Sequence, residues 1–232
     1  MKCVIHGSGG VGGYYGGCLA RAGHEVFFIA RGAHLEAIQQ QGLSIKSAKG
    51  DFRIETPNSG ERCDPNFYPD LVIVAVKSWQ LPEITEEIKN YCTPSTLILP
   101  LQNGADASNI LADTLGTDRI LGGLTKIFSK IEAPGVINHF TGATYIGFGE
   151  YFQDPQFQNA PDSLSERCRN LEKELDSTPG IDAEAFVDIQ KELWRKMLIF
   201  VSTSGVGTIT RTPNGVFRSI PETREMLIQL IR

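Results

Sequence analysis

The chain has 232 residues, of which 41% are hydrophobic and 21% charged, and its formal net charge is −5. This length and composition are typical of a globular protein with one large domain or two small ones. The negative charge argues against broad binding to nucleic acids or membrane surfaces. No apolar run approaches membrane-spanning length and the N-terminus lacks a signal-peptide pattern, so we expect a cytoplasmic protein.

The cysteines and histidines show no metal-binding or catalytic pattern. The five cysteines are scattered and never in C-x-x-C spacing, and the four histidines have no spacing typical of a metal site or a triad. Cys3 and Cys18 lie in apolar segments, which favours buried free thiols. We therefore expect no metal site.

The first 31 residues contain the strongest local signal. An apolar strand over 3–5 precedes a glycine-rich loop, and a helix-like stretch and a second strand over 25–30 follow it. The loop places Gly7, Gly9 and Gly12 in G-x-G-x-x-G spacing. In this context the first glycine permits a tight turn, the second lets the backbone approach a pyrophosphate, and the third lets the helix pack close to the sheet. The helix N-terminus favours the anion.

The residue nineteen positions after Gly12 is Arg31, where proteins that bind NAD usually have Asp or Glu. A carboxylate there would repel a 2′-phosphate, whereas a guanidinium can bind it through a forked, charge-assisted contact. We therefore expect NADP(H) rather than NAD(H) as the cofactor. The alternative is a surface arginine after a strand, beside a loop that is merely rich in glycine.

Strands and helices alternate up to residue 116. The run over 70–76 is rich in β-branched residues, as in strands buried on both faces of a parallel sheet. The alternation predicts an α/β fold with a Rossmann-like doubly wound sheet. The expected helices cover 34–41, 79–91 and 105–115, and the expected strands cover 43–45, 52–54, 70–76 and 96–101.

Three further strands, over 120–128, 135–140 and 144–148, are expected to form an antiparallel extension. Residues 151–161 are rich in Gln, Asp, Asn and Pro, which predicts an exposed loop. The last elements expected before the domain boundary are a charged helix over 163–176 and an edge strand over 181–187.

We place a domain boundary after residue 187. Residues 1–187 then form the NADP-binding Rossmann-like domain, and residues 188–232 begin an all-α domain whose first helix is expected over 188–204. Pro221–Arg232 has a proline start and an acidic first turn, which predict another helix. About two helices bury a core poorly, so we expect a truncated chain or a partner, such as a second copy in a homodimer.

Polar side chains follow two buried strands at their carboxyl ends, where ligands bind in open α/β sheets. Lys77 follows the strand over 70–76, which is too apolar to bury an ammonium. Asn103 follows the strand over 96–101, and its amide can both donate and accept. Lys77 could contact a cofactor phosphate or a substrate carboxylate, and Asn103 could bridge cofactor and substrate. The alternatives are a solvated lysine and an ordinary Asn-Gly turn.

Lys196 is the candidate proton donor. At about 100° per residue, it falls on the stripe of its helix that carries Ile189, Leu193 and Phe200. A lysine on this face is desolvated or opens into a cavity, and both suit protonation of the alkoxide formed when a ketone is reduced. The alternative is a lysine whose stem covers the core while its ammonium reaches water.

Four motifs in this order resemble the ketopantoate reductase (2-dehydropantoate 2-reductase) family. They are GSGGVG followed by AGHEVFFIARG, then VAVKSWQ, then LQNG, and finally ELWRK followed by TRTPNG. Members of this family reduce 2-dehydropantoate to (R)-pantoate with NADPH, a step in pantothenate and coenzyme A biosynthesis. The resemblance extends over nearly the whole chain.

The resemblance implies a role for each candidate residue. The glycine loop and Arg31 would bind NADPH, Lys77 and Asn103 would lie at the junction of cofactor and substrate, and Lys196 would donate the proton. The cofactor-binding residues would be Gly7, Ser8, Gly9, Gly10, Val11, Gly12, Arg31, Lys77 and Asn103, and the substrate-binding residues Asn103, Ser204 and Asn214.

The chain departs from the family pattern beyond Lys196. The family's best-characterised pattern has asparagines four and eight residues after the catalytic lysine, where this chain has Phe200 and Ser204. Ser204 can still hydrogen-bond a substrate, but Phe200 makes the pocket more apolar, and apolar pockets discriminate substrates less sharply. The family's later helices have no counterpart before Arg232. The alternatives are a reductase of another branched 2-oxo acid and an NADP-binding module without turnover.

Overall fold

The computed structural model describes residues 1–151 and 163–232, so the loop expected over 151–161 lies, apart from Tyr151, outside the described residues. The chain divides into two compact units, Met1–Ile189 and Gln190–Arg232. The first unit contains two β-sheets and the helices that pack on them. Among the described residues, no helix is long and apolar enough to cross a membrane.

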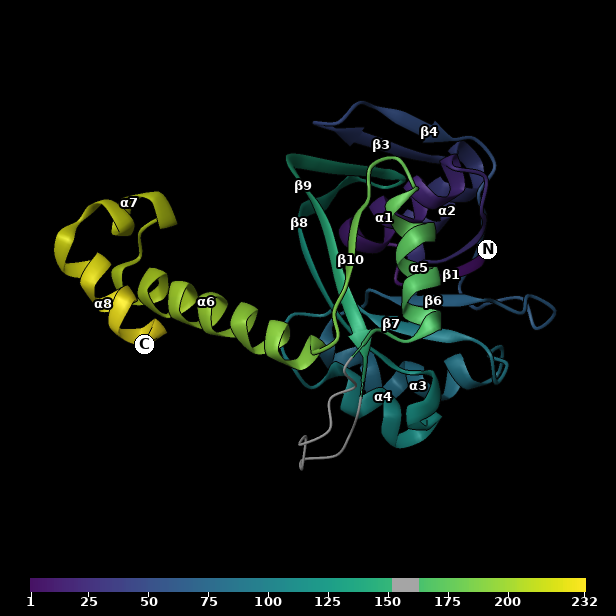
Figure 1. Cartoon of the computed structure of the whole chain (residues 1–232). Helices are drawn as coiled ribbons and strands as arrows, with labels where there is room; N and C mark the ends of the chain where they lie inside the picture. The colour runs from purple at the N-terminus through teal and green to yellow at the C-terminus, as the bar shows by residue number, and fades with distance from the viewer. Residues whose placement is uncertain (152–162) are drawn as a thin grey trace. The chain divides into compact units, whose positions relative to one another are not determined.

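Five parallel strands form the first sheet, sheet A (Figure 1). Their order is β5-β2-β1-β6-β7, so the chain moves outward from β1 and then crosses to the other side of β1. This reversal is the switch point of a doubly wound sheet, which confirms the predicted Rossmann-like α/β fold. The strands are β1 (Lys2–His6), β2 (Glu25–Ile29), β5 (Asn58–Gly60), β6 (Leu71–Val74) and β7 (Leu97–Pro100).

Alternate residues of these strands pack against different layers, because successive side chains of a strand point to opposite faces. On β1, Ile5 packs in the cluster that contains residues of α1 (Gly10–Arg21). Its neighbour Val4 packs on the other face, with residues of α3 (Leu81–Lys89) and α4 (Ala107–Leu115). Burial on both faces explains why these strands are almost continuously apolar.

The second sheet, sheet B, is built around a long hairpin of β8 (Leu121–Ala133) and β9 (Val136–Glu150). The hairpin is antiparallel, as expected, but it has two long strands where the sequence predicted three short ones. It also belongs to a separate sheet, because β9 pairs with strands outside sheet A. β9 includes Gly142, although glycine disfavours strands, and its pairing with β8 is interrupted there, between His139 and Thr144. β9 also pairs with β3 (Leu43–Ser47) and with β10 (Asp182–Ala185). β4 (Phe52–Ile54) pairs with the other edge of β3.

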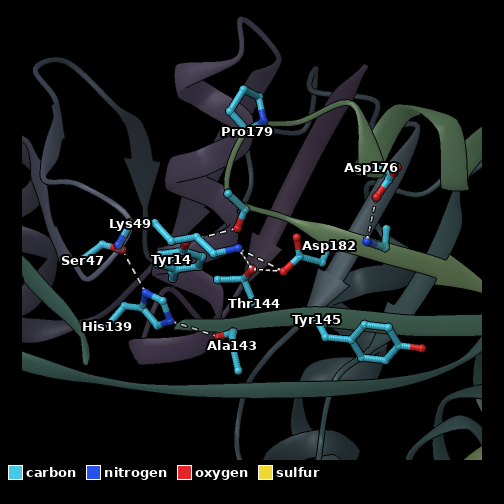
Figure 2. Close-up of polar contacts among 12 residues, drawn as sticks. Tyr14, Ser47, Lys49, His139, Ala143, Thr144, Tyr145, Asp176, Pro179 and Asp182 are labelled. Atoms are coloured by element: carbon cyan, nitrogen blue, oxygen red, sulfur yellow. Dashed lines mark hydrogen bonds and ion pairs between the residues drawn. The ribbon is translucent and has the colours of Figure 1, made fainter. Parts of the chain in front are cut away.

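Polar side chains join three strands of sheet B (Figure 2). Lys49 Nζ donates to Thr144 Oγ1 at 2.7 Å and to Asp182 Oδ2 at 3.0 Å, and Thr144 Oγ1 donates to the same carboxylate at 2.6 Å. Both hydrogen bonds lower the pKa of Asp182, the one from Thr144 more than the one from Lys49. Ser47 and His139 face each other in β3 and β9 and hydrogen-bond at 2.9 Å. The network fixes the register of β3, β9 and β10.

Glycines let α1 lie between the two sheets. A Cβ at Gly16 would lie 2.6 Å from Ile5 Cγ1 of sheet A, and a Cβ at Gly17 would lie 3.1 Å from Ile45 Cγ1 of sheet B. The helix can therefore approach both sheets closely. The remaining helical elements of the first unit are α2 (Gly32–Gln41), η1 (Ser78–Gln80), η2 (Thr117–Arg119) and α5 (Glu166–Asp176).

The five cysteines are free thiols. Cys3 and Cys18 are fully buried, as the sequence predicted. Burial raises the pKa of the Cys3 thiol to about 12, so it stays protonated at neutral pH and packs as a small apolar side chain.

Within the described residues, the second unit consists of helices alone: α6 (Ile189–Thr210), whose first residue belongs to the first unit, α7 (Asn214–Ser219) and α8 (Pro221–Ile231). α6 continues past the predicted end at Ser204, although Gly205 and Gly207 lower its intrinsic helix propensity. Packing against the other helices stabilises it there. The core of this unit contains Val206, Phe217 and Leu227.

A short helix, α7, begins directly after Pro213. Pro213 is the N-cap of α7, with φ −60° and ψ 153°, and Asn214 is the first helical residue. The proline restricts the chain to a conformation that can precede a helix, and a helix of six residues follows it.

Candidate functional site

A cavity of about 510 Å³ lies at the carboxyl ends of β1, β2 and β6. Gly7 follows β1, Arg31 follows β2, and Lys77 follows β6, and all three line the cavity. These strands flank the switch point of sheet A, which is where open α/β sheets bind their ligands. Three residues that the sequence singled out separately therefore share one cavity.

The glycine loop forms one wall of this cavity. Gly7 has φ +102°, a conformation that L side chains rarely adopt. A Cβ at Gly12 would lie 2.3 Å from the Gly7 carbonyl oxygen, so only glycine lets α1 begin so close to β1. At Gly9 a Cβ would meet nothing within 4 Å, so this backbone faces open space. Of the loop residues singled out from the sequence, Gly7, Ser8, Gly9, Gly10 and Val11 line the cavity, and Gly12 packs behind them.

Two buried hydroxyl groups in the cavity wall have no hydrogen-bond partner among the described residues. They are Ser8 Oγ, in the glycine loop, and Ser129 Oγ, in β8. Leaving a buried hydroxyl without a partner is costly, so both fit a ligand that carries oxygen acceptors. The N-cap of α1, Gly9, has no side chain to cap the helix. These features fit the phosphates of a dinucleotide at the N-terminus of α1.

His34 holds the glycine loop in place. Its Nε2 lies 2.9 Å from the Ser8 carbonyl oxygen, and the Gly135 N–H donates to its Nδ1 at 3.0 Å. Because a backbone N–H can only donate, Nδ1 accepts and the ring proton lies on Nε2. Burial lowers the pKa of His34, which favours this neutral form. Since the C=O and N–H of a trans peptide point in opposite directions, His34 also fixes the direction of the Gly9 N–H.

His6, at the end of β1, is a second neutral imidazole in the cavity wall. Its Nδ1 lies 2.8 Å from the Tyr91 hydroxyl. Burial, and to a lesser extent the charge of Arg31, lowers the pKa of His6 to about 4. The positive charges that line the cavity at neutral pH therefore come from lysine and arginine.

Gln102 supports the loop that carries Lys77. Its Nε2 donates to the carbonyl oxygens of Val74 and Val76, each at 3.0 Å. The Lys77 N–H in turn donates to Gln80 Oε1 at 3.1 Å. These contacts fix the backbone on both sides of Lys77, whose side chain is exposed.

β8 contributes residues that sequence reasoning missed. Ser129 and Lys130 line the cavity, and a Cβ at Gly10 would lie 2.5 Å from the Ser129 carbonyl oxygen. The hairpin thus approaches the N-terminus of α1 closely and adds a lysine beside it. No local motif marks either residue, because their place depends on how sheet B packs against α1.

The remaining candidates lie elsewhere. Asn103 follows β7, is exposed and does not line the cavity. In the second unit Lys196 is partly buried, whereas Ser204 and Asn214 are exposed. The expected apolar stripe is buried at Ile189 and Leu193, but the prediction is wrong for Phe200, which is 46% exposed because the described neighbours leave it uncovered. Within residues 1–151 and 163–232, no cluster of three or more metal-ligating side chains occurs.

Comparisons with known proteins identify relatives of this chain. The family model described as ketopantoate reductase PanE/ApbA matches residues 3–151. The oxidoreductase YkpB of Bacillus subtilis, which is uncharacterized, is 32% identical over 219 residues, covering 93% of this chain and 67% of that protein.

Solved structures agree with this relationship. The crystal structure of 2-dehydropantoate 2-reductase from Geobacter metallireducens superposes with a TM-score of 0.86 at 27% identity, covering 98% of this chain and 71% of that one. D-mandelate dehydrogenase, solved with NADH and anilino(oxo)acetate, has a TM-score of 0.84 at 21% identity, covering 98% and 70%, and so shares the fold. The chain therefore belongs to the ketopantoate reductase PanE/ApbA family and is an oxidoreductase that uses a nicotinamide cofactor.

Proposed function

We propose that this protein reduces 2-dehydropantoate to (R)-pantoate with NADPH, in pantothenate and coenzyme A biosynthesis. The cavity at the ends of β1, β2 and β6 carries the proposal, because the glycine loop, Arg31 and Lys77 all line it. Membership of the ketopantoate reductase family supports the same reaction. When bound, NADPH supplies a hydride to the ketone carbon.

The residues of the cavity have distinct roles in this proposal. The N–H groups at the start of α1 and the Ser8 hydroxyl bind the pyrophosphate, and the Arg31 guanidinium binds the 2′-phosphate. Lys130, which lies beside Gly10, adds positive charge near the pyrophosphate. Lys77 acts where the cofactor meets the substrate, and so does Asn103, which follows β7 and does not line the cavity.

The second unit supplies the substrate-binding and proton-donating groups. Lys196 donates a proton to the ketone oxygen, and its ammonium stabilises the negative charge that develops there. Ser204 and Asn214 hydrogen-bond the substrate. Ser204 and Asn214 are exposed among the described residues, so their side chains are accessible to a ligand.

An assay of NADPH oxidation tests the proposal directly. The protein is mixed with NADPH and either 2-dehydropantoate or one of a panel of branched 2-oxo acids. Turnover with 2-dehydropantoate at the highest kcat/KM supports the proposed substrate. Absence of turnover with every 2-oxo acid, in this chain and in any longer natural form, would refute the reductase proposal.

A second candidate substrate class follows from Phe200. This side chain stands where the family pattern has an asparagine, and it cannot hydrogen-bond a hydroxyl group. A pocket that lacks that partner discriminates less against substrates without the hydroxyl. A higher kcat/KM for an unhydroxylated branched 2-oxo acid than for 2-dehydropantoate would favour this candidate.

The role of Arg31 is tested by Arg31→Asp. A charge-assisted hydrogen bond contributes about 1.5–3 kcal/mol, and the new carboxylate repels the 2′-phosphate. We therefore expect the Kd for NADPH to rise at least about tenfold, while the Kd for NADH stays the same or falls. Fluorescence titration of both nucleotides measures the ratio. An unchanged ratio would count against the 2′-phosphate contact.

We also infer a homodimer formed through the helical unit. α6 exposes four consecutive apolar residues, Leu198, Ile199, Phe200 and Val201, each about half exposed. Exposed apolar surface of this kind favours association. Sedimentation equilibrium should give twice the 25.5 kDa of the chain, and Ile199→Glu should give the monomer mass. A monomer in the unsubstituted protein at micromolar concentration would contradict the inference.

A further inference from the structure

Arg31, which we assign to the 2′-phosphate, faces a carboxylate from another element. Its Nη1 lies 3.6 Å from Glu83 Oε1 in the first turn of α3. Glu83 stands in the sequence between Gln80 and Ile84, and both of these line the cavity together with Arg31. The ion pair therefore forms at the edge of the cavity, where the adenosine end of a dinucleotide is expected in this fold.

A second carboxylate lies near the same guanidinium. Glu87, one turn further along α3, interacts electrostatically with Arg31 and with Arg62, and burial raises its pKa. Of the two acids, Glu83 makes the ion pair with Arg31. The guanidinium thus forms an ion pair with a side chain of α3.

The two nucleotides meet this arrangement differently. A phosphate monoester carries about 1.5 to 2 negative charges at pH 7, so the 2′-phosphate of NADPH must displace Glu83 from Arg31 or bind beside a like charge. The 2′-hydroxyl of NADH has no charge and can donate to a carboxylate. In most NAD-binding folds an acid at the end of the second strand accepts this hydrogen bond. Here the carboxylate beside the end of the second strand is that of Glu83, which belongs to α3.

We propose that Glu83 is a specificity-determining residue, which weakens the binding of NADPH relative to NADH by occupying the guanidinium that the 2′-phosphate needs. This inference rests on the proposed binding of the 2′-phosphate by Arg31. The pair is exposed, with side-chain exposures of 54% and 68%, so the competition is of moderate size. Glu83 limits the preference for NADPH without abolishing it.

The test is the substitution Glu83→Gln, with Kd values for NADPH and NADH measured by fluorescence titration of the full chain without substrate. Glutamine keeps the shape of the side chain and removes its charge. We expect the Kd for NADPH to fall about three- to fivefold, and the Kd for NADH not to fall. Glu86→Gln is the matched control, because Glu86 is an exposed acid on the same helix. It should change both Kd values by less than about twofold.

A double-mutant cycle with Arg31→Gln separates the two proposals. If Glu83 acts through Arg31, Glu83→Gln should improve NADPH binding by less than about twofold once Arg31 is replaced. If Glu83→Gln lowers the Kd for NADPH as much in the Arg31→Gln protein as in the unsubstituted protein, the inference is overturned. An unchanged Kd in Glu83→Gln, with a raised Kd in Arg31→Gln, would overturn the inference and leave the proposed cofactor intact. Unchanged NADPH binding in Arg31→Gln would refute both.

Discussion

Replacing Lys196 with alanine is expected to lower kcat by about 10²- to 10⁴-fold, the usual contribution of a positioned general acid. The ammonium interacts most strongly with the alkoxide that develops in the transition state and less with the neutral ketone. The KM for the 2-oxo acid should therefore change less than kcat. Steady-state kinetics with saturating NADPH measure both constants.

Two controls separate this role from a structural one. Lys191 is an exposed lysine on the same helix, and Lys191→Ala should keep kcat within about twofold, because an exposed charge contributes little. The Kd for NADPH should be unchanged in Lys196→Ala, since the groups that we assign to the cofactor lie in the first unit. Equal kcat in Lys196→Ala and the unsubstituted protein would refute the assignment of Lys196 as proton donor.

The parts of the fold and site that the sequence predicts are those with a local cause. Gly7 must adopt a positive φ directly after a strand, and Lys77 must emerge at a strand end because the strand is apolar. Such features depend on a few neighbouring residues. The parallel order of the strands then brings the two residues, with Arg31, to one edge of the sheet.

The features that the sequence does not predict depend on contacts between distant segments. β5 reads Asn-Ser-Gly, without a β-branched or aromatic residue, and it forms only because its backbone pairs with β2. Ser129 and Lys130 reach the cavity through the packing of the β8–β9 hairpin against α1. Glu83 meets Arg31 because α3 begins beside the end of β2. No periodicity within any of these segments contains that information.

The glycine loop permits a prediction in which two similar substitutions have different effects. In Gly12→Ala the new Cβ would lie 2.3 Å from the Gly7 carbonyl oxygen and 2.8 Å from Ile5 Cγ2. A backbone oxygen cannot move aside as a flexible side chain can, so α1 must shift away from β1. Overpacking of this kind costs about 1–3 kcal/mol, or about 2 to 12 °C in Tm. Because the loop is displaced, the Kd for NADPH should rise at least about tenfold.

Gly9→Ala is the matched comparison. Its φ of −76° is accessible to alanine, and its Cβ would meet no protein atom within 4 Å. The free energy of unfolding should therefore change by no more than about 1 kcal/mol, the cost of a poorer N-cap residue. The same Cβ would stand where the backbone must approach the pyrophosphate, so the Kd for NADPH should rise by about tenfold or more. Thermal unfolding and nucleotide titration of both variants test this contrast. If Gly9→Ala binds NADPH as tightly as the unsubstituted protein, the pyrophosphate does not lie against this loop, and Gly9 faces open space for another reason.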